Sequence, residues 1–272
     1  MKPIIPITRR PDSRGFTLVE VLISLSIITM VLTMCMSTFL LGLRAMYKDN
    51  QRLETNATLR TLMAQVTKET LDASFFYLFP YYSDIDADVS LVSGAAGGPS
   101  SMVQIEDAAD NDYDKWISHG DCLVLVTTTS RFRTTDIRQI RVYYRMVTTQ
   151  TARNGQAELR YFESQDWGEG SSSTSNGHPL STLAGELNAI NLAANPSPTG
   201  HKVLAKKTIG RIVPAASTPF VAGDRYPVFS SESPDSTATN GFIAINMEVV
   251  NGTTQNNLLS SSSFNYTVSP RR

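Results

Sequence analysis

The 272-residue chain is poor in several features that mark common protein classes. Its two cysteines, Cys35 and Cys122, are too few and too far apart for a disulfide framework or a metal knuckle. The 24 basic and 25 acidic residues nearly cancel, which argues against a protein that binds nucleic acid by bulk phosphate neutralisation. A polytopic membrane protein is excluded because the chain has a single long apolar run. These absences leave a protein with one anchor and a mostly polar body.

Motifs of catalysis and phosphate binding are also missing from the sequence. It contains no G-x-S-x-G, no H-E-x-x-H and no phosphate-binding loop. The three histidines, His119, His178 and His201, fall in expected loops without a cysteine or carboxylate at metal-ligand spacing. We therefore expect solvent-exposed loop histidines, no enzyme activity and no bound cofactor.

Proline and glycine are scarce over a long stretch near the N-terminus. Between Phe16 and Pro80 the chain has no proline and a single glycine, Gly42. This stretch predicts one helix from about Thr17 to Ser74, roughly 58 residues or about 87 Å at 1.5 Å per residue.

The first half of the expected helix is long enough to cross a membrane. Val21–Leu43 is a run of 23 uncharged residues, against the roughly 20 that a spanning helix needs. It is longer than the apolar core of a secretory signal and lacks a small-residue cleavage site. The basic residues of the preceding segment place that segment in the cytoplasm and the body outside it. They are Lys2, Arg9, Arg10 and Arg14.

The second half of the expected helix is amphipathic. Leu59, Leu62, Met63 and Val66 recur at helical spacing and present an apolar stripe for a sheet to cover. Phe75–Pro80 then ends the helix, and we expect this aromatic segment to wedge under the sheet.

Strand patterns dominate the rest of the chain, so we expect an α+β fold with a mainly antiparallel sheet. In the second expected strand, Ile140–Val147, the residues alternate between two faces. One face is expected to carry Ile140, Val142, Tyr144 and Met146, and the other Arg141, Tyr143 and Arg145. Segments 81–120 and 168–200 are expected loops, with one helical turn near Leu183–Ile190. The expected strands are Cys122–Val126, Ile140–Val147, Leu159–Glu163, Val203–Val213, Phe242–Val250 and Phe264–Val268.

An acidic stretch raises the possibility of calcium. Asp110, Asp112, Asp114 and Asp121 stand at positions 1, 3, 5 and 12 of a calcium-loop template. However, Lys115 occupies the position of the required glycine, and an aspartate replaces the bidentate glutamate. The favoured interpretation is therefore a solvated acidic loop with no metal, and calcium is the alternative.

Basic side chains gather around the second expected strand, next to Tyr143 and Tyr144. A single-stranded nucleic acid site combines such a patch with aromatic rings. The solvent face of a strand is normally polar, and acids are numerous nearby, so nucleic acid is not the favoured partner. The cluster comprises Arg131, Arg133, Asp136, Arg138, Arg141 and Arg145.

One charge, Glu20, interrupts the apolar segment near its start. A charge inside a bilayer costs roughly 2.5 kcal/mol or more, so such a residue is usually paired or functional. Snorkelling to the interface would explain why the charge is tolerated, but not the sequence around it. That sequence runs from Arg14 through Gly15-Phe16-Thr17-Leu18-Val19-Glu20 to Val21-Leu22-Ile23-Ser24-Leu25.

Arg14 to Leu25 resembles the cleavage and methylation motif of type IV pilins and type II secretion pseudopilins. The resemblance implies that a prepilin peptidase cuts between Gly15 and Phe16 and then methylates Phe16. Glu20 would become the fifth residue of the mature chain and neutralise the Phe16 amino group of a neighbouring subunit during assembly. Pairing makes two buried charges tolerable.

The same resemblance implies how the chain is divided and where it resides. Residues 1–15 would be a cleaved leader, 16–43 a membrane or filament-core helix, 44–74 its amphipathic continuation, and 75–272 a β-rich periplasmic head. The precursor would cross the inner membrane once, with its N-terminus in the cytoplasm, before entering a pilus or pseudopilus.

The order of the strands resembles a narrower group. Asp121–Thr129, the I-R-V-Y-Y-R-M strand at 140–146 and E-L-R-Y-F-E at 158–163 look like J-type minor pseudopilins and W-type minor pilins. This resemblance implies a tip-proximal subunit that primes assembly and pairs with other pilins or pseudopilins through its helix. Two alternatives stay open: a pilin-like module that binds DNA or a surface, and a signal-anchored periplasmic protein that retains its leader.

Overall fold

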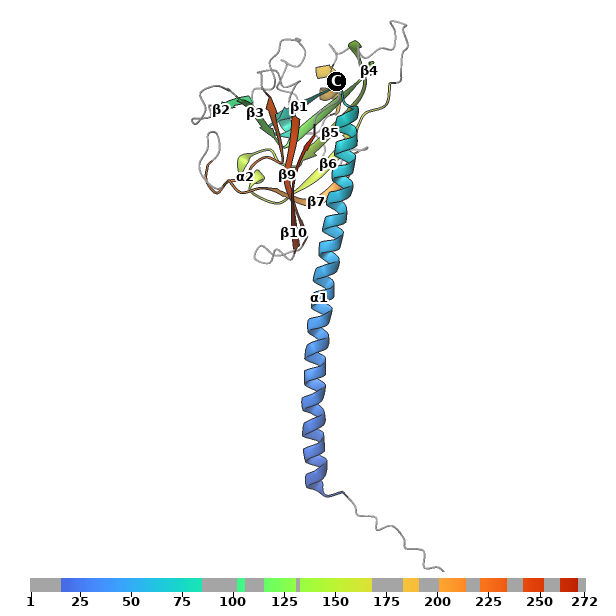
Figure 1. Cartoon of the computed structure of the whole chain (residues 1–272), viewed down its shortest axis with the longest axis vertical. Helices are drawn as coiled ribbons and strands as arrows, with labels where there is room; N and C mark the ends of the chain where they lie inside the picture. The colour runs from blue at the N-terminus through green and yellow to red at the C-terminus, as the bar shows by residue number, and fades with distance from the viewer. Residues whose placement is uncertain are drawn as a thin grey trace, which may run out of the picture. The chain divides into compact units, whose positions relative to one another are not determined.

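The computed structural model describes residues 16–84, 102–105, 115–130, 133–167, 183–190, 201–213, 221–233, 242–251 and 260–268. The chain forms two compact units, Met1–Asn50 and Gln51–Arg272. In its described part the first unit is helical, and the second unit carries the sheet (Figure 1).

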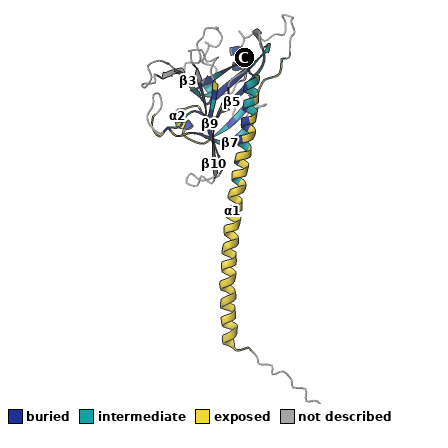
Figure 2. Cartoon of the chain, in the orientation of Figure 1, coloured by how far each residue is buried: buried dark blue, intermediate teal, exposed yellow. Residues whose placement is uncertain are grey.

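Helix α1 spans Leu18–Asp72, close to the expected limits of Thr17 and Ser74. Residues 16–50 are exposed throughout, whereas one face of the helix is buried within the second unit (Figure 2). The expected stripe is confirmed, because Leu59, Leu62, Met63 and Val66 are all buried. The helix ends where the Ala73 N–H donates to the Glu69 carbonyl and the Ser74 N–H donates to the carbonyl of a strand residue, Val126.

The α+β prediction is confirmed, because ten strands form one sheet whose pairings are all antiparallel among the described residues. The strands are β1 (Phe75–Phe79), β2 (Met102–Ile105), β3 (Lys115–Gly120), β4 (Cys122–Ser130), β5 (Arg133–Arg145), β6 (Ala157–Glu163), β7 (Lys202–Gly210), β8 (Phe229–Ser233), β9 (Phe242–Asn251) and β10 (Ser260–Val268). The short helices are η1 (Tyr82–Asp84), α2 (Gln150–Arg153) and α3 (Leu183–Ile190).

The strand order is β1-β4-β5-β6-β7-β9-β8-β3-β2, and β10 pairs with β9 outside this path. One edge of β9 is shared by β7 and β8, and the other is taken by β10. Met247 of β9, for example, pairs with Gly210 of β7 and with Phe264 of β10. The sheet therefore branches at β9.

The sheet bends back on itself at Asp121. This residue alone separates β3 from β4, although these strands lie near opposite ends of the strand order. Strand β1 accordingly contacts β3 and β8. A Cβ atom on Gly120 would lie 2.1 Å from the Phe79 carbonyl oxygen, so only glycine permits this close approach.

Hydrophobic side chains fill both faces of the central strands. One cluster joins the buried stripe of α1 to residues such as Phe76, Leu125 and Ile245. The other lies around Val124 and Val142, and includes Leu183 and Leu187 of α3. Cys122 belongs to this second cluster and is fully buried, as expected for a small core residue.

Three expectations for the sheet were wrong. Segment 81–120 was an expected loop but contains β2 and β3. Phe75–Phe79 does not wedge under the sheet, because its backbone pairs with β4 as strand β1. The second strand was expected to be half solvent-exposed, but β5 lies between β4 and β6 and is packed on both faces, so that even Arg145 is buried.

Candidate functional site

The start of α1 holds Glu20 in a reciprocal pair of hydrogen bonds with Thr17. The Glu20 N–H donates to Thr17 Oγ1 at 3.3 Å, and Glu20 Oε2 accepts from the Thr17 N–H at 3.1 Å. Thr17 Oγ1 also donates to the same carboxylate oxygen at 3.2 Å. The T-x-x-E spacing thus forms a capping box, which satisfies two backbone donors at the helix start. Sequence reasoning singled out Glu20 but missed this spacing.

Phe16, directly before the capping box, is 85% exposed. Gly15 lies outside the described residues, so cleavage between these two residues and methylation of Phe16 stay predictions. The geometry places the Glu20 carboxylate at the N-terminal end of the helix, where the helix dipole favours a negative charge.

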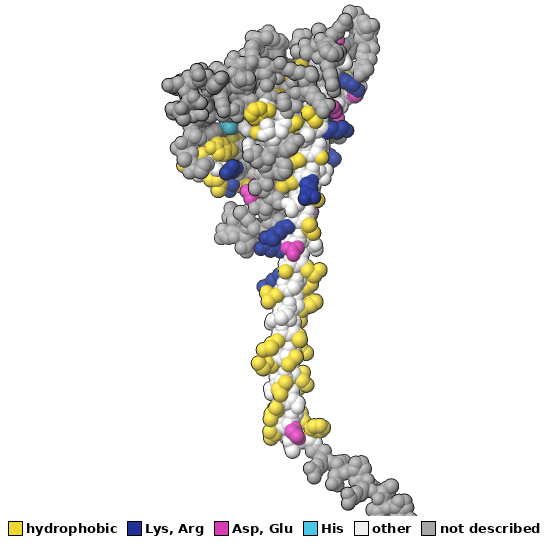
Figure 3. Space-filling view, in the orientation of Figure 1, with side chains coloured by type: hydrophobic (Ala, Val, Ile, Leu, Met, Phe, Trp, Pro, Cys, Tyr) yellow, Lys and Arg dark blue, Asp and Glu magenta, His cyan; other side chains and the backbone are white. Residues whose placement is uncertain are grey.

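Hydroxyl groups within the apolar stretch of α1 are satisfied by the helix itself. Ser26, Thr29, Thr33, Ser37 and Thr38 each donate to a carbonyl three or four residues earlier, at 2.8–3.1 Å. Such back-bonding leaves these side chains without unmet polar groups in an apolar medium. The helix is long and apolar enough to span a membrane, and Figure 3 shows its hydrophobic side chains.

A second carboxylate of α1, Glu69, fixes the helix to the sheet. It accepts hydrogen bonds from the hydroxyl of Tyr143 on β5 at 2.5 Å, from that of Tyr161 on β6 at 3.1 Å, and from Gln65 Nε2 at 3.1 Å. Arg141 Nε lies 3.9 Å from Glu69 Oε2. Burial and the contact with Glu69 raise the pKa of both tyrosines, so both hydroxyls stay protonated donors.

A buried ion cluster surrounds Asp121 at the bend between β3 and β4. Arg153 Nε donates to Asp121 Oδ2 at 2.6 Å, and Arg145 Nη1 donates to Oδ1 at 3.4 Å. The Val228 N–H also donates to Oδ1, at 3.1 Å. Arg145 Nη2 reaches three backbone carbonyls, those of Arg153, Gly155 and Thr208. The cluster therefore ties together segments that lie far apart in the sequence.

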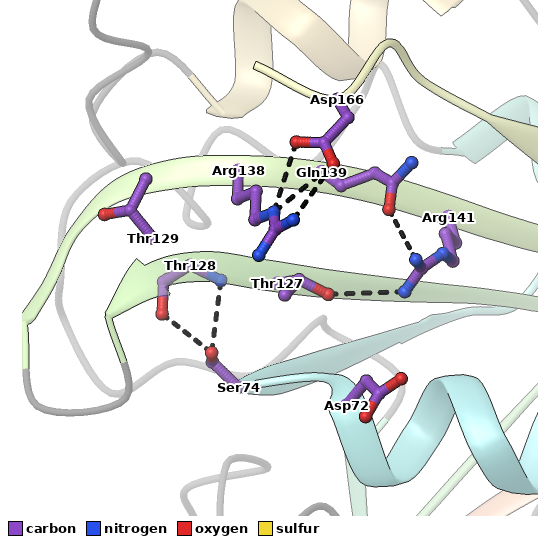
Figure 4. Close-up of a pocket in the computed structure, with 9 residues that line it drawn as sticks. All are labelled: Asp72, Ser74, Thr127, Thr128, Thr129, Arg138, Gln139, Arg141 and Asp166. Atoms are coloured by element: carbon purple, nitrogen blue, oxygen red, sulfur yellow. Dashed lines mark hydrogen bonds and ion pairs between the residues drawn. The ribbon is translucent and has the colours of Figure 1, made fainter. Parts of the chain in front are cut away.

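A polar cleft opens beside the C-terminal end of α1, with a volume of about 390 Å³. Arg138 Nε donates to Asp166 at 3.1 Å (Figure 4). Arg141 Nε donates to Glu163 at 3.1 Å. Both guanidinium groups in the cleft are thus already neutralised by carboxylates. The lining residues are Asp72, Ser74, Thr127, Thr128, Thr129, Arg138, Gln139, Arg141 and Asp166.

The structure gives Asp121 a buried position and not a solvated one. Its carboxylate is fully buried, and both oxygens are occupied by guanidinium groups, so the calcium-loop placement of this residue is corrected. Asp110, Asp112 and Asp114 lie outside the described residues, so calcium there stays an untested expectation. Among the described residues, no cluster of three or more metal-ligating side chains occurs.

Among the described residues, the basic side chains around strand β5 do not form a free basic surface. Arg145, Tyr143 and Tyr144 are buried, while Arg138 and Arg141 are paired with acids. The two tyrosines therefore offer no exposed ring for a nucleic acid base. Arg131 and the side chain of Arg133 lie outside the described residues, and Asp136 is half-buried.

The expectation of a loop histidine was wrong for His119 and confirmed for His201, but the solvent exposure expected for His201 is only partial. His119 belongs to β3 and stacks on Tyr226, and burial, followed by the charge of Arg153, lowers its pKa to about 4. His201 is half-buried, and its Nδ1 lies 2.5 Å from the Tyr144 hydroxyl. His178 lies outside the described residues.

Comparison with known proteins gives one match, confined to the N-terminus. Residues 10–36 match the family described as the prokaryotic N-terminal methylation motif. No curated protein and no solved structure matches the chain. The motif and the apolar helix that carries it support a membrane-anchored subunit of the pilin or pseudopilin type. Such a motif implies processing by a prepilin peptidase and assembly with other pilins, a structural rather than an enzymatic role.

Tyr143→Phe tests the attachment of the helix to the sheet. Removing a hydrogen bond to a charged group is expected to lower the free energy of unfolding by about 1.5–3 kcal/mol. Urea unfolding followed by tryptophan fluorescence measures the change. Tyr77→Phe is the matched control, because no partner of its hydroxyl is found among the described residues. Equal losses in both variants would contradict the role of Glu69.

Asp121→Asn tests the ion cluster at the bend. The substitution keeps the shape of the side chain but leaves two buried guanidinium groups without a countercharge, which is expected to cost about 3–5 kcal/mol of stability. Thermal unfolding measures this loss. Asp136→Asn, at a half-buried carboxylate with no partner among the described residues, should change stability by no more than about 0.5 kcal/mol. A similarly small effect at both positions would show that the cluster does not hold the bend.

Proposed function

We propose that the chain is a minor pilin or pseudopilin subunit that works through assembly rather than catalysis. It is made as a precursor in the inner membrane, with its leader in the cytoplasm and its head in the periplasm. A prepilin peptidase cuts it between Gly15 and Phe16 and methylates Phe16, and the subunit then enters a type IV pilus or a type II secretion pseudopilus. The observation that carries this proposal is the methylation motif at residues 10–36, followed by a helix able to span a membrane.

The role of Glu20 follows from the charge balance at the start of the helix. Cleavage before Phe16 creates an α-amino group, which is a cation at neutral pH. When such a cation and a carboxylate move from the membrane surface into a filament core, pairing offsets the cost of burying the two charges. The capping box already orients the Glu20 carboxylate toward the helix N-terminus, so the mature subunit presents it ready to accept a neighbour's amino group.

The large head supports a minor subunit near the tip. About 198 residues follow Ser74, which fits poorly into a fibre of many close-packed identical copies. The sequence segments 121–129, 140–146 and 158–163 resemble those of J-type minor pseudopilins and W-type minor pilins. We therefore place the subunit in a complex with other minor pilins or pseudopilins, formed through their helices, that primes assembly for secretion, motility or adhesion.

Two variants separate the charge of Glu20 from its capping role. Glu20→Gln keeps a side chain that can complete a capping box but removes the charge. Thr17→Ala removes the capping hydroxyl, at a cost of about 0.5–2 kcal/mol, but keeps the charge. We expect the first variant to be cleaved and inserted normally yet to be missing from sheared fibres, and the second to assemble.

Processing is scored first in both variants, as the loss of the leader measured by intact mass. Asp49→Ala serves as the control, since it removes an exposed acid of α1 outside the apolar run. Normal assembly of Glu20→Gln would contradict the proposed pairing of Glu20 with the amino group of a neighbouring subunit. Normal assembly of Glu20→Gln together with failure of Thr17→Ala would assign Glu20 to helix capping alone.

A further inference from the structure

A charged and aromatic surface lies on α1 directly after its apolar stretch, within the first unit. Arg44 follows the last residue of the uncharged run, and Tyr47 and Lys48 come one turn later. Both basic side chains are exposed, and Tyr47 is 65% exposed. Among the described residues, none of these three side chains has a hydrogen-bond or ion-pair partner. Figure 3 shows basic side chains where the hydrophobic part of the helix ends.

These three side chains share one side of the helix. At 3.6 residues per turn, Lys48 lies about 40° to one side of Arg44 and Tyr47 about 60° to the other. The nearest acid in the sequence, Asp49, lies about 140° around the helix from Arg44. The surface formed by Arg44, Tyr47 and Lys48, here called the belt, therefore carries an uncompensated positive charge next to an aromatic ring.

The length of the apolar run places the belt at a membrane surface. Arg44 comes twenty-four positions after Glu20, which corresponds to about 36 Å of helix. The hydrocarbon core of a bilayer is about 30 Å thick, and about 40–45 Å with its headgroups. When the helix spans the bilayer, both charges can therefore lie in headgroup layers, Glu20 in one leaflet and the belt in the other. Tyrosine is enriched at this depth because its ring is amphipathic.

We infer that the belt binds the phosphate groups of anionic phospholipids in the leaflet on the side of the head. Arg44 and Lys48 pair with lipid phosphates, while Tyr47 lies among the headgroups and fixes the depth of the helix. This depth keeps Glu20 in the opposite headgroup layer, in contact with water, until the subunit leaves the membrane. The inference rests on the proposed function, because it requires that α1 spans a membrane.

The test is lipid selection by the full chain reconstituted in vesicles of phosphatidylcholine with about one third phosphatidylglycerol. Gentle detergent release followed by mass spectrometry gives the ratio of the two lipids that stay bound. We expect the wild type to retain phosphatidylglycerol preferentially, and high salt to weaken this preference. The double variant Arg44→Gln/Lys48→Gln removes both basic residues. Each replacement should lower the bound ratio of phosphatidylglycerol to phosphatidylcholine roughly five-fold, the factor that corresponds to about 1 kcal/mol. Arg60→Gln, at an exposed position of the second unit, should leave it unchanged.

The outcomes separate this inference from the proposed function. Release of the wild type from vesicles by alkaline carbonate would contradict membrane anchoring itself. Retention with the same lipid ratio in the wild type and the double variant would overturn the inference alone. The inference would also be overturned if the wild type showed no lipid preference and the double variant lost co-purifying subunits. That result would indicate that the belt binds an acidic surface of another protein.

Discussion

Two carboxylates of α1, Glu20 and Glu69, both need hydrogen-bond partners, and they find them in different parts of the chain. The apolar stretch is long enough to span a membrane, whose hydrocarbon core offers no hydrogen bonds, and its hydroxyls donate to the helix's own carbonyls. Glu20 is placed at the first turn, where backbone donors are free to meet its carboxylate. These hydroxyls and the Glu20 carboxylate therefore have hydrogen-bond partners within the helix itself.

Within the second unit, side chains of the sheet supply the partners of the Glu69 carboxylate. Glu69 would be a costly charge on the buried side of the helix, but two tyrosine hydroxyls from β5 and β6 hydrogen-bond to it. Because these contacts are short and partly buried, they tie the helix to the centre of the sheet. The Asp121 cluster in turn joins Arg145 and Arg153 to the bend between β3 and β4.

Sequence patterns predicted the structure correctly where one local interaction determines it. The limits of α1 and its buried stripe followed from helical spacing and from the absence of proline, and the motif around Glu20 agrees with the family match at residues 10–36. The patterns failed where residues distant in the sequence meet. Arg145 and Asp121 were expected to be exposed, because the pattern of each local segment indicated a solvent-facing side chain. The ion pair that these two residues form in the folded chain leaves no pattern in either segment. Glu69 left a signal that could have been used, since it falls three residues after Val66 on the apolar stripe.

The central claim is that Phe16 begins the working protein and that the preceding fifteen residues only direct it to the membrane. N-terminal peptide mass spectrometry on the protein extracted from its native membrane tests this claim most directly. The account predicts a chain that starts at Phe16 and carries one added methyl group on its amino nitrogen. An intact leader, in cells with an active prepilin peptidase, would contradict it and leave an ordinary anchored domain.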